Sequence, residues 1–199
     1  MRKLASIQKI LDVFPIEGAD RICSYKIQGW NVVDSVGKYN VGDLVVYCEI
    51  DSWLPTEIAP FLSKGNEPRE YDGTKGERLR SVRLRGTLSQ GLILPISTIP
   101  ETWDDGVLCS VDDLYSEGDD VSELLGIKKY EPPIPACLAG EVRGLFPSFI
   151  PKTDQIRIQN LVEEFESFKE FQFEISEKID GSSCTIYHND GDFSVCSRN

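Results

Sequence analysis

The sequence has few of the residues that build metal sites, and it lacks the segments that mark export or membrane insertion. It contains a single histidine, His188, and none of its six cysteines forms a CxxC pair, so a structural zinc site is not expected. No apolar run approaches the roughly 18 residues of a membrane-spanning helix. The N-terminus has neither the uninterrupted apolar core nor the cleavage site of a signal peptide. We therefore expect a cytoplasmic or nuclear protein with reduced thiols, although six cysteines also suit a secreted protein with disulfides.

Positive charge is scarce as well: 21 lysines and arginines face 33 acidic residues, which gives a net charge of -12. This balance argues against nucleic-acid binding over the whole surface, because phosphates are neutralised by Lys and Arg. The charges are unevenly distributed, however. Residues 75–85 contain five basic residues and one acidic residue, whereas residues 101–131 contain ten acidic and two basic ones. Any nucleic-acid site must therefore be local.

Short β-prone runs separated by turns dominate the first hundred residues. The run LVVYCEI at 44–50 predicts a buried strand, and residues 79–85 and 88–95 predict a hairpin around Gly86-Thr87. Further strands are expected at 4–13, 22–28 and 31–33. Because helical periodicity is rare, with one short helix expected at 121–127, the pattern favours a small β-barrel or sandwich.

An acidic stretch that ends in Pro132-Pro133-Ile134-Pro135 indicates a domain boundary near residue 130. We expect a first domain at 1–130, with the acidic linker at its end, and a second at 131–199. In the second, we expect a helix at 155–168 with Asp154 as its cap, a strand at 171–177, and a hairpin around Asn189-Asp190-Gly191. A nucleotide-binding domain of about 65 residues is small, so we expect the chain to be C-terminally incomplete.

The most informative segment is Glu177-Lys178-Ile179-Asp180-Gly181-Ser182-Ser183. A predicted strand brings a lysine to a glycine turn, with a carboxylate two residues later. Partial burial or a nearby cation lowers a lysine pKa and frees the amine for nucleophilic attack, and Gly181 lets backbone N–H groups approach a phosphate. These residues permit a covalent Lys–phosphate intermediate. They are equally compatible with an exposed lysine before an ordinary β-turn.

This segment resembles motif I, KxDG, of the covalent nucleotidyltransferases, which are the ATP-dependent ligases and mRNA capping enzymes. Cys196-Ser197-Arg198-Asn199 resembles the next motif, and residues 146–154 with Arg157-Ile-Gln-Asn160 resemble the segment before motif I in RNA ligases. Residues 42–55 and 84–92 are similar to the N-terminal OB domain of RNA ligases of the Deinococcus and Naegleria type. The resemblance covers essentially the whole chain, but the family's later motifs are absent.

The resemblance implies a fold that is mainly β plus α+β: an N-terminal OB-type barrel followed by the first part of a nucleotidyltransferase domain of the ATP-grasp-like ligase kind. It implies an ATP-dependent RNA ligase in RNA repair that joins a 5′-phosphate to a 3′-OH through a lysyl-AMP intermediate with Mg²⁺ or Mn²⁺. Its partners are RNA ends, and a monomer without an obligate protein partner is expected. No metal ligand is assigned within the chain, and we expect the 199 residues alone to be weakly active or inactive.

The resemblance also assigns roles to single residues. Lys178 is the nucleophile, Glu177 lies beside adenine, and Ile179, Asp180 and Gly181 form the nucleotide-binding loop. Arg198 contacts the ribose or a phosphate, and Arg157 faces a phosphate of the nucleotide or of the RNA 5′ end. The alternatives are a turn-stabilising role for Asp180 and a solvated helix charge for Arg157. Lys152 is a further candidate for a phosphate contact, although a surface role is expected for it.

In the OB domain, Arg80, Arg83 and Arg85 are the predicted nucleic-acid contacts, since OB folds bind nucleic acid with basic strands and aromatic platforms. The two-residue period of a strand puts Arg83 and Arg85 on one face; a solvated basic face is the alternative. Trp30, Tyr47 and Trp53 are candidate stacking residues, although burial in the core is the expected fate of Tyr47 and Trp53.

One other function class remains open. Residues 15–22 also resemble the tRNA-binding OB domains attached to some synthetases, which would make the chain a non-catalytic RNA-binding module. A capping guanylyltransferase or a DNA ligase is disfavoured, because those enzymes carry the OB domain after the KxDG motif.

Overall fold

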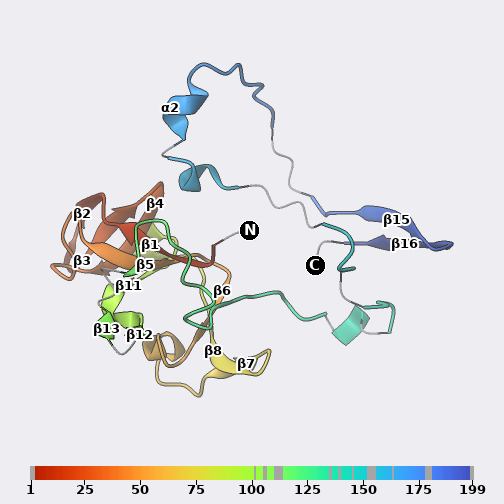
Figure 1. The fold of residues 1–199 in the computed structure, drawn as a ribbon, viewed down its shortest axis with the longest axis horizontal. Coiled ribbons are helices and arrows are strands. Elements are labelled where there is room, and N and C mark those ends of the chain that lie inside the picture. The colour runs from red at the N-terminus through yellow and green to blue at the C-terminus, as the bar shows by residue number, and fades with distance from the viewer. Residues whose placement is uncertain are drawn as a thin grey trace. The chain divides into compact units, whose positions relative to one another are not determined.

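The computed structural model describes residues 3–100, 102–104, 107–109, 114–134, 136–138, 140–144, 146–151, 156–162, 164–177 and 181–197. The chain divides into two compact units, which are described separately. Unit 1 comprises Met1–Tyr130 with Arg157–Val162, and unit 2 comprises Glu131–Ile156 with Glu163–Asn199. Strands predominate over helices in the ribbon (Figure 1).

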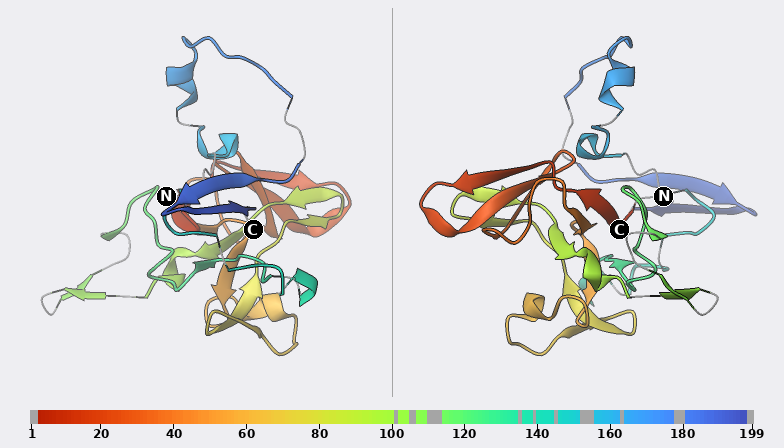
Figure 2. Two further views of the ribbon diagram at one scale, coloured as in Figure 1. Left: turned by 90° about the vertical axis from the view of Figure 1, so that its right-hand side faces the viewer. Right: turned by 60° about the vertical axis from the view of Figure 1, so that its left-hand side comes forward.

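Two antiparallel sheets form the centre of unit 1 (Figures 1 and 2). In the first, β5 (Leu44–Cys48) lies between β1 (Ala5–Lys9) and β11 (Leu92–Pro95). The second is a meander of β2 (Asp12–Ile16), β3 (Ala19–Ile27) and β4 (Trp30–Ser35). The strands expected at 22–28, 31–33 and 44–50 are thus present, whereas the apolar run at 4–13 is divided between β1 and β2.

The remaining elements of unit 1 are short. A four-stranded sheet has the order β14-β6-β8-β7, and the other described elements of unit 1 are small hairpins and 3₁₀ turns, including η4 (Ile158–Asn160). The bounds are β6 (Ser52–Pro55), η1 (Pro60–Ser63), β7 (Arg69–Tyr71), β8 (Thr74–Arg78), β9 (Val82–Leu84), β10 (Thr87–Ser89), η2 (Ile96–Thr98), β12 (Thr102–Asp104), β13 (Val107–Cys109) and β14 (Lys128–Lys129).

Two expectations for unit 1 need correction. The hairpin around Gly86 exists, but only β9 and β10 form it. Residues 92–95 pair instead with β5, where they satisfy backbone N–H and C=O groups on one edge of that buried strand. Residues 121–127 form a turn rather than a helix. Their backbone is held by the barrel, since the Val121 N–H donates to the Ala5 carbonyl and the Ser122 hydroxyl accepts from the Leu4 and Ala5 amides.

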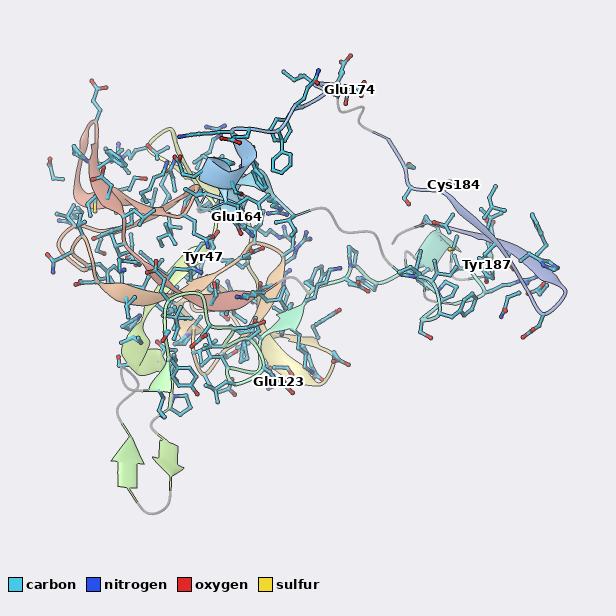
Figure 3. The ribbon with its side chains drawn as sticks, turned by 45° about the horizontal axis from the view of Figure 1, so that its top comes forward. Tyr47, Glu123, Glu164, Glu174, Cys184 and Tyr187 are labelled. Carbon is cyan, nitrogen blue, oxygen red and sulfur yellow. The ribbon has the colours of Figure 1, made fainter. Side chains whose placement is uncertain are left out.

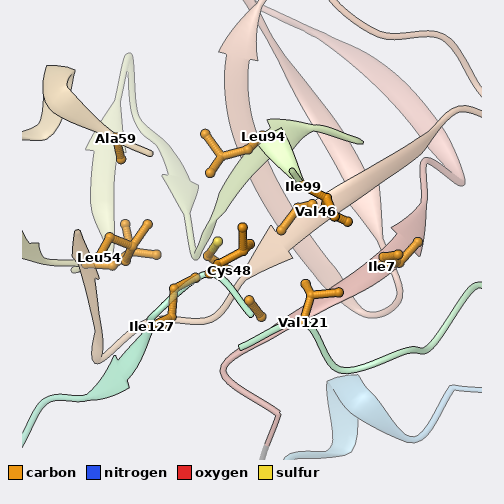
Figure 4. Close-up of a cluster of buried hydrophobic side chains, with 12 residues drawn as sticks. Ile7, Val46, Cys48, Leu54, Ala59, Leu94, Ile99, Val121 and Ile127 are labelled. Atoms are coloured by element: carbon orange, nitrogen blue, oxygen red, sulfur yellow. The ribbon is translucent and has the colours of Figure 1, made fainter. Parts of the chain in front are cut away.

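The apolar run of β5 is continuous because both faces of this strand are buried. Val46 and Cys48 face one cluster, with Ile7, Leu54 and Leu94 among its members (Figure 4). Val45 and Tyr47 face a second cluster, with Tyr25, Ile27, Trp30, Val32 and Ile93 among its members. Successive side chains of a strand point to opposite faces, so one strand contributes to both halves of the core.

The three candidate stacking aromatics belong to the packed interior. Tyr47, Trp53 and Trp30 are each 2% exposed, and Figure 3 shows Tyr47 among the packed side chains of unit 1. Burial of Tyr47 and Trp53 is the expected outcome. Trp30 joins them, so none of the three offers an open face to a nucleobase.

Unit 2 contains η3 (Ala136–Leu138), the single-turn helix α2 (Phe165–Phe168), and the hairpin of β15 (Thr185–Asn189) and β16 (Asp192–Cys196). The hairpin is confirmed. Asp190 and Gly191 have φ values of 50° and 86°, as the tight turn between two twisted strands requires. Figure 3 shows Tyr187 on this hairpin and Glu174 on the extended segment that follows α2.

Two further predictions for the second half are wrong. A helix at 155–168 does not form: of its described residues, 158–160 make the 3₁₀ turn η4 (Ile158–Asn160) on unit 1, and only 165–168 are α-helical. Residues 171–177 are extended but pair with no strand among the described residues, and Ile175 is 96% exposed. The alternating pattern of 171–177 therefore does not correspond to a strand within the described residues.

Candidate functional site

Four of the predicted site residues, Lys178, Ile179, Asp180 and Arg198, lie outside the described residues, and so does Lys152. The described neighbours of the motif, Glu177 and Gly181, are both exposed. A side-chain carbon added at Gly181 would meet no atom within 4 Å, so the space beside this glycine is open. The roles assigned to these residues stay predictions.

The hairpin after Gly181 determines which ends of the motif region lie together. Thr185, the first residue of β15, pairs with Cys196, the last residue of β16. Antiparallel pairing therefore places the residues just before Thr185 and just after Cys196 at the same end of the hairpin. Of the described motif residues, Cys196 lies at this end of the hairpin, and Gly181 precedes the same end by four residues in the chain.

The segment that precedes the motif also contacts the hairpin, within unit 2. A guanidinium N–H of Arg143 donates to an Asp192 carboxylate oxygen at 3.2 Å, and the rings of Phe149 and Tyr187 meet edge to face with centroids 5.4 Å apart. Both Arg143 and Asp192 are largely exposed, so the ion pair contributes little by itself. The aromatic contact thus joins Phe149, from the segment that precedes the motif, to the hairpin.

Arg157 lies on the barrel rather than on a solvated helix. Its guanidinium carbon is 5.5 Å from the centroid of the Trp30 ring, a cation–π arrangement. The Gly29 N–H donates to the Gln159 carbonyl at 2.9 Å. The Trp30 indole N–H donates to Asn160 Oδ1 at 2.5 Å, and Asn160 Nδ2 donates to Glu49 Oε1 at 2.7 Å. This set of contacts docks residues 157–162 on unit 1.

The predicted basic residues of the OB domain separate in the structure. Arg85 is in the turn, with φ 49°, and Arg83 donates to the Gly86 carbonyl at 3.2 Å. The prediction that period two puts them on one strand face is therefore wrong, because the strand ends at Leu84. Arg78, from the same basic run, forms two hydrogen bonds to Asp51 Oδ1 at 3.1 and 2.6 Å.

Arg80 instead lines a hollow of about 460 Å³ in unit 1. Lys64, Arg69 and Arg78 also line it, together with the acidic Glu67 and Glu77. Arg69 Nε lies 3.8 Å from Glu77 Oε2, which makes a long ion pair. The Arg80 side chain is exposed. Lys64 and Arg69 were missed by the sequence reasoning. The sequence gives only a weak indication of their role. Each is a cation beside Gly65 or Pro68 in a polar loop, and no local pattern relates this loop to Arg80.

Neither a metal centre nor a spanning helix is found in the part of the chain that the structure describes. Those residues include no group of three or more His, Cys, Asp or Glu side chains that could hold a metal ion. Within the same residues, no helix has the length and apolar character needed to cross a membrane.

Comparison with known proteins identifies relatives of this architecture. A family model described as an OB-fold domain matches residues 4–96. A search of curated proteins found no match. Among solved structures, the chain is similar to Naegleria gruberi RNA ligase with PPi, at 44% identity and a TM-score of 0.74 over 100% of this chain and 56% of that chain. A glutamate-to-alanine mutant of that ligase with AMP and Mn gives 44% identity and a TM-score of 0.76 over the same shares.

A lysine-to-alanine mutant of the same ligase with ATP and Mn gives 45% identity and a TM-score of 0.72, over 100% of this chain and 55% of that chain. The chain thus spans a little over half the length of the solved relatives it matches. The predicted fold class is confirmed: the chain is mainly β, with an OB-type barrel followed by the first part of a nucleotidyltransferase domain.

Proposed function

We propose that the protein is an ATP-dependent RNA ligase that joins an RNA 5′-phosphate to a 3′-OH. The observation that carries the proposal is the 44% identity to Naegleria gruberi RNA ligase along the whole of this chain. Structures of that ligase hold ATP, AMP, PPi and Mn. ATP is the substrate of adenylyl transfer, and AMP and pyrophosphate are the two parts into which transfer divides it. The non-catalytic tRNA-binding alternative is not favoured.

The proposed chemistry begins at Lys178. Its neutral amine attacks the ATP α-phosphorus, the bond to pyrophosphate breaks, and the amine proton leaves, which yields a lysyl-AMP phosphoramidate. AMP then passes to the RNA 5′-phosphate, and the 3′-OH displaces AMP. Mutants of the Naegleria ligase include one lysine and one aspartate two positions after it. Lys178 and Asp180 have the same spacing, which supports this assignment.

The other assignments are part of the same proposal. Glu177, Ile179, Asp180 and Gly181 surround the nucleotide, and Arg198 binds its ribose or a phosphate. A divalent cation, Mg²⁺ or Mn²⁺, neutralises the phosphates, with no ligand assigned within this chain. We propose 1–130 as the OB domain and 131–199 as nucleotidyltransferase sequence, in a monomer that works in the cytoplasm or nucleus.

For RNA, we propose that the OB domain contacts the phosphate backbone through Arg80 at the hollow and through Arg83 and Arg85 on the neighbouring turn. Lys64 and Arg69 supply further positive charge at the hollow. This arrangement explains how a chain with a net charge of -12 binds a polyanion: cations from the polar loop and from the basic run converge locally, and phosphate contacts need no more than that.

The test is covalent labelling of the purified protein, together with any sequence that follows Asn199. With α-labelled ATP and Mg²⁺ or Mn²⁺, a denaturing gel should show label on the protein, and α-labelled GTP should give none. Lys178→Ala should abolish the label. The control is Lys169→Ala, because Lys169 is an exposed lysine that pairs only with Glu166 among the described residues. Labelling that survives Lys178→Ala would overturn the proposal.

A further inference from the structure

The docked segment Arg157–Val162 follows Tyr130 in the chain but belongs to unit 1. It is fixed by a short relay of side chains, Glu49 to Asn160 to Trp30, and by one backbone hydrogen bond. The Asn160 amide uses its oxygen toward the indole and its nitrogen toward the carboxylate, so both ends of the amide are oriented. Glu49 is 6% exposed and Trp30 is 2% exposed, which makes the relay largely protected from water.

The relay determines where the Arg157 guanidinium lies. The cation–π contact holds the guanidinium carbon 5.5 Å from the centroid of the Trp30 ring. The planar fork of N–H donors on the same group matches phosphate oxygens. Among the residues that the structure describes, none forms a hydrogen bond or ion pair with the Arg157 guanidinium, although the Asn160 N–H donates to the Arg157 backbone carbonyl at 2.9 Å. The side chain is half-buried. A half-buried, oriented cation with unused donors is an arrangement suited to an anion.

We infer that Trp30, Asn160 and Glu49 are positioning residues that hold Arg157 to bind a phosphate, supplied by ATP or by the RNA 5′ end. The inference rests on the proposed ligase function. It assigns to OB-domain residues a part in the reaction that is separate from RNA backbone binding. It also explains why a buried carboxylate and a buried indole are directed at a segment so far along the chain.

A double-mutant cycle tests the inference in the protein with any sequence that follows Asn199. Arg157→Ala should slow the affected step about 10- to 100-fold, the range expected for loss of hydrogen bonds to a charged group. Asn160→Ala should slow the same step about tenfold, because the guanidinium loses its fixed orientation. The double variant should be no slower than Arg157→Ala alone, since a positioning residue acts only through its partner.

A reciprocal exchange separates positioning from general stability. Asn160→Asp removes the amide donor and brings two carboxylates together, so the step should slow. Adding Glu49→Gln supplies a donor to the new carboxylate, and Asn160→Asp/Glu49→Gln should recover most of the lost rate. Val32→Ala is the matched control. It removes a side chain that is 1% exposed on the same strand as Trp30, and its rate effect should multiply with that of Arg157→Ala.

Two assays distinguish the source of the phosphate. A defect in labelling by ATP indicates a nucleotide phosphate, whereas a defect confined to sealing of a pre-adenylylated nick, with labelling intact, indicates the RNA end. Multiplicative effects of Asn160→Ala and Arg157→Ala, or no recovery in the exchange variant, would overturn the inference. Absence of label in the unsubstituted protein would instead overturn the proposed function itself.

Discussion

Gly29 and Gln159 approach each other so closely that no side chain fits between them. A Cβ atom at position 29 would lie 2.6 Å from Gln159 Cα, a separation that real Cβ atoms essentially never show. At the same place the Gly29 N–H donates to the Gln159 carbonyl at 2.9 Å. The obstructing atoms are Cα, Cβ and the carbonyl oxygen of Gln159, which follow the backbone, so they cannot move aside without displacing the docked segment.

We therefore expect Gly29→Ala to release residues 157–162 from the barrel. Amide hydrogen exchange should increase at residues 159–161 while β5 stays protected, because the barrel core does not depend on this segment. Labelling or sealing should fall as in Asn160→Ala. The control is Gly144→Ala, where an added Cβ meets no atom within 4 Å; equal exchange in both variants would contradict the docking.

Replacement of Arg80 should weaken RNA binding, and the loss of affinity should depend on the salt concentration. Arg80→Ala removes one exposed cation from the hollow, so affinity for a nicked RNA duplex should fall a few-fold. The slope of log affinity against log salt concentration should decrease by about one. Fluorescence anisotropy over a range of salt concentrations measures both quantities.

The comparison variant for Arg80 is Arg21→Ala. Arg21 is an exposed arginine on β3 and does not line the hollow. Its removal changes the net charge by the same amount. If Arg21→Ala lowers the affinity and the salt slope as much as Arg80→Ala does, RNA responds to overall charge and the hollow has no special part.

Cys48 should make the protein less stable in alkali. Complete burial raises the pKa of its thiol from 9.0 to about 12. Below pH 9 the thiol is neutral in both folded and unfolded chains. Between pH 9 and 12 the unfolded chain releases a proton that the folded chain retains, so the free energy of unfolding falls by about 1.4 kcal/mol per pH unit.

Urea unfolding at several pH values measures this loss. Cys48→Ala should be less stable at pH 8. Above pH 9, its free energy of unfolding should fall less steeply with pH, because one fewer proton is released on unfolding. Cys137→Ala, at an exposed thiol, should retain the full slope. Burial also raises the pKa of Tyr25 to about 12, so a residual slope is expected above pH 10 in every variant.

Several elements could be predicted because their signals are local. The run 44–50 is mostly apolar on both faces, which favours a strand buried on both sides, and β5 is such a strand. Asp190-Gly191 tolerates positive φ, so the hairpin at this position was predictable. The KxDG segment around Lys178 is likewise a signal in consecutive residues, although its geometry lies outside the described residues.

Other elements depended on partners far away in the sequence. Residues 155–168 carry a helical pattern, yet Gln159 and Asn160 bond to the barrel instead. The basic run at 78–85 has a strand-like alternation, but its arginines diverge into an ion pair, a hollow and a turn.

The sequence by itself determined the β-rich class, the fully buried strand β5, the turn at Asp190-Gly191 and the candidate nucleophile Lys178, because each depends on the chemistry of adjacent residues. The tertiary structure alone decided that Arg157 rests on Trp30 and that Arg80 meets Lys64 and Arg69 around a hollow. Such contacts join residues distant in the chain, and the free energy that selects them comes from packing and hydrogen bonds that form only in the folded barrel.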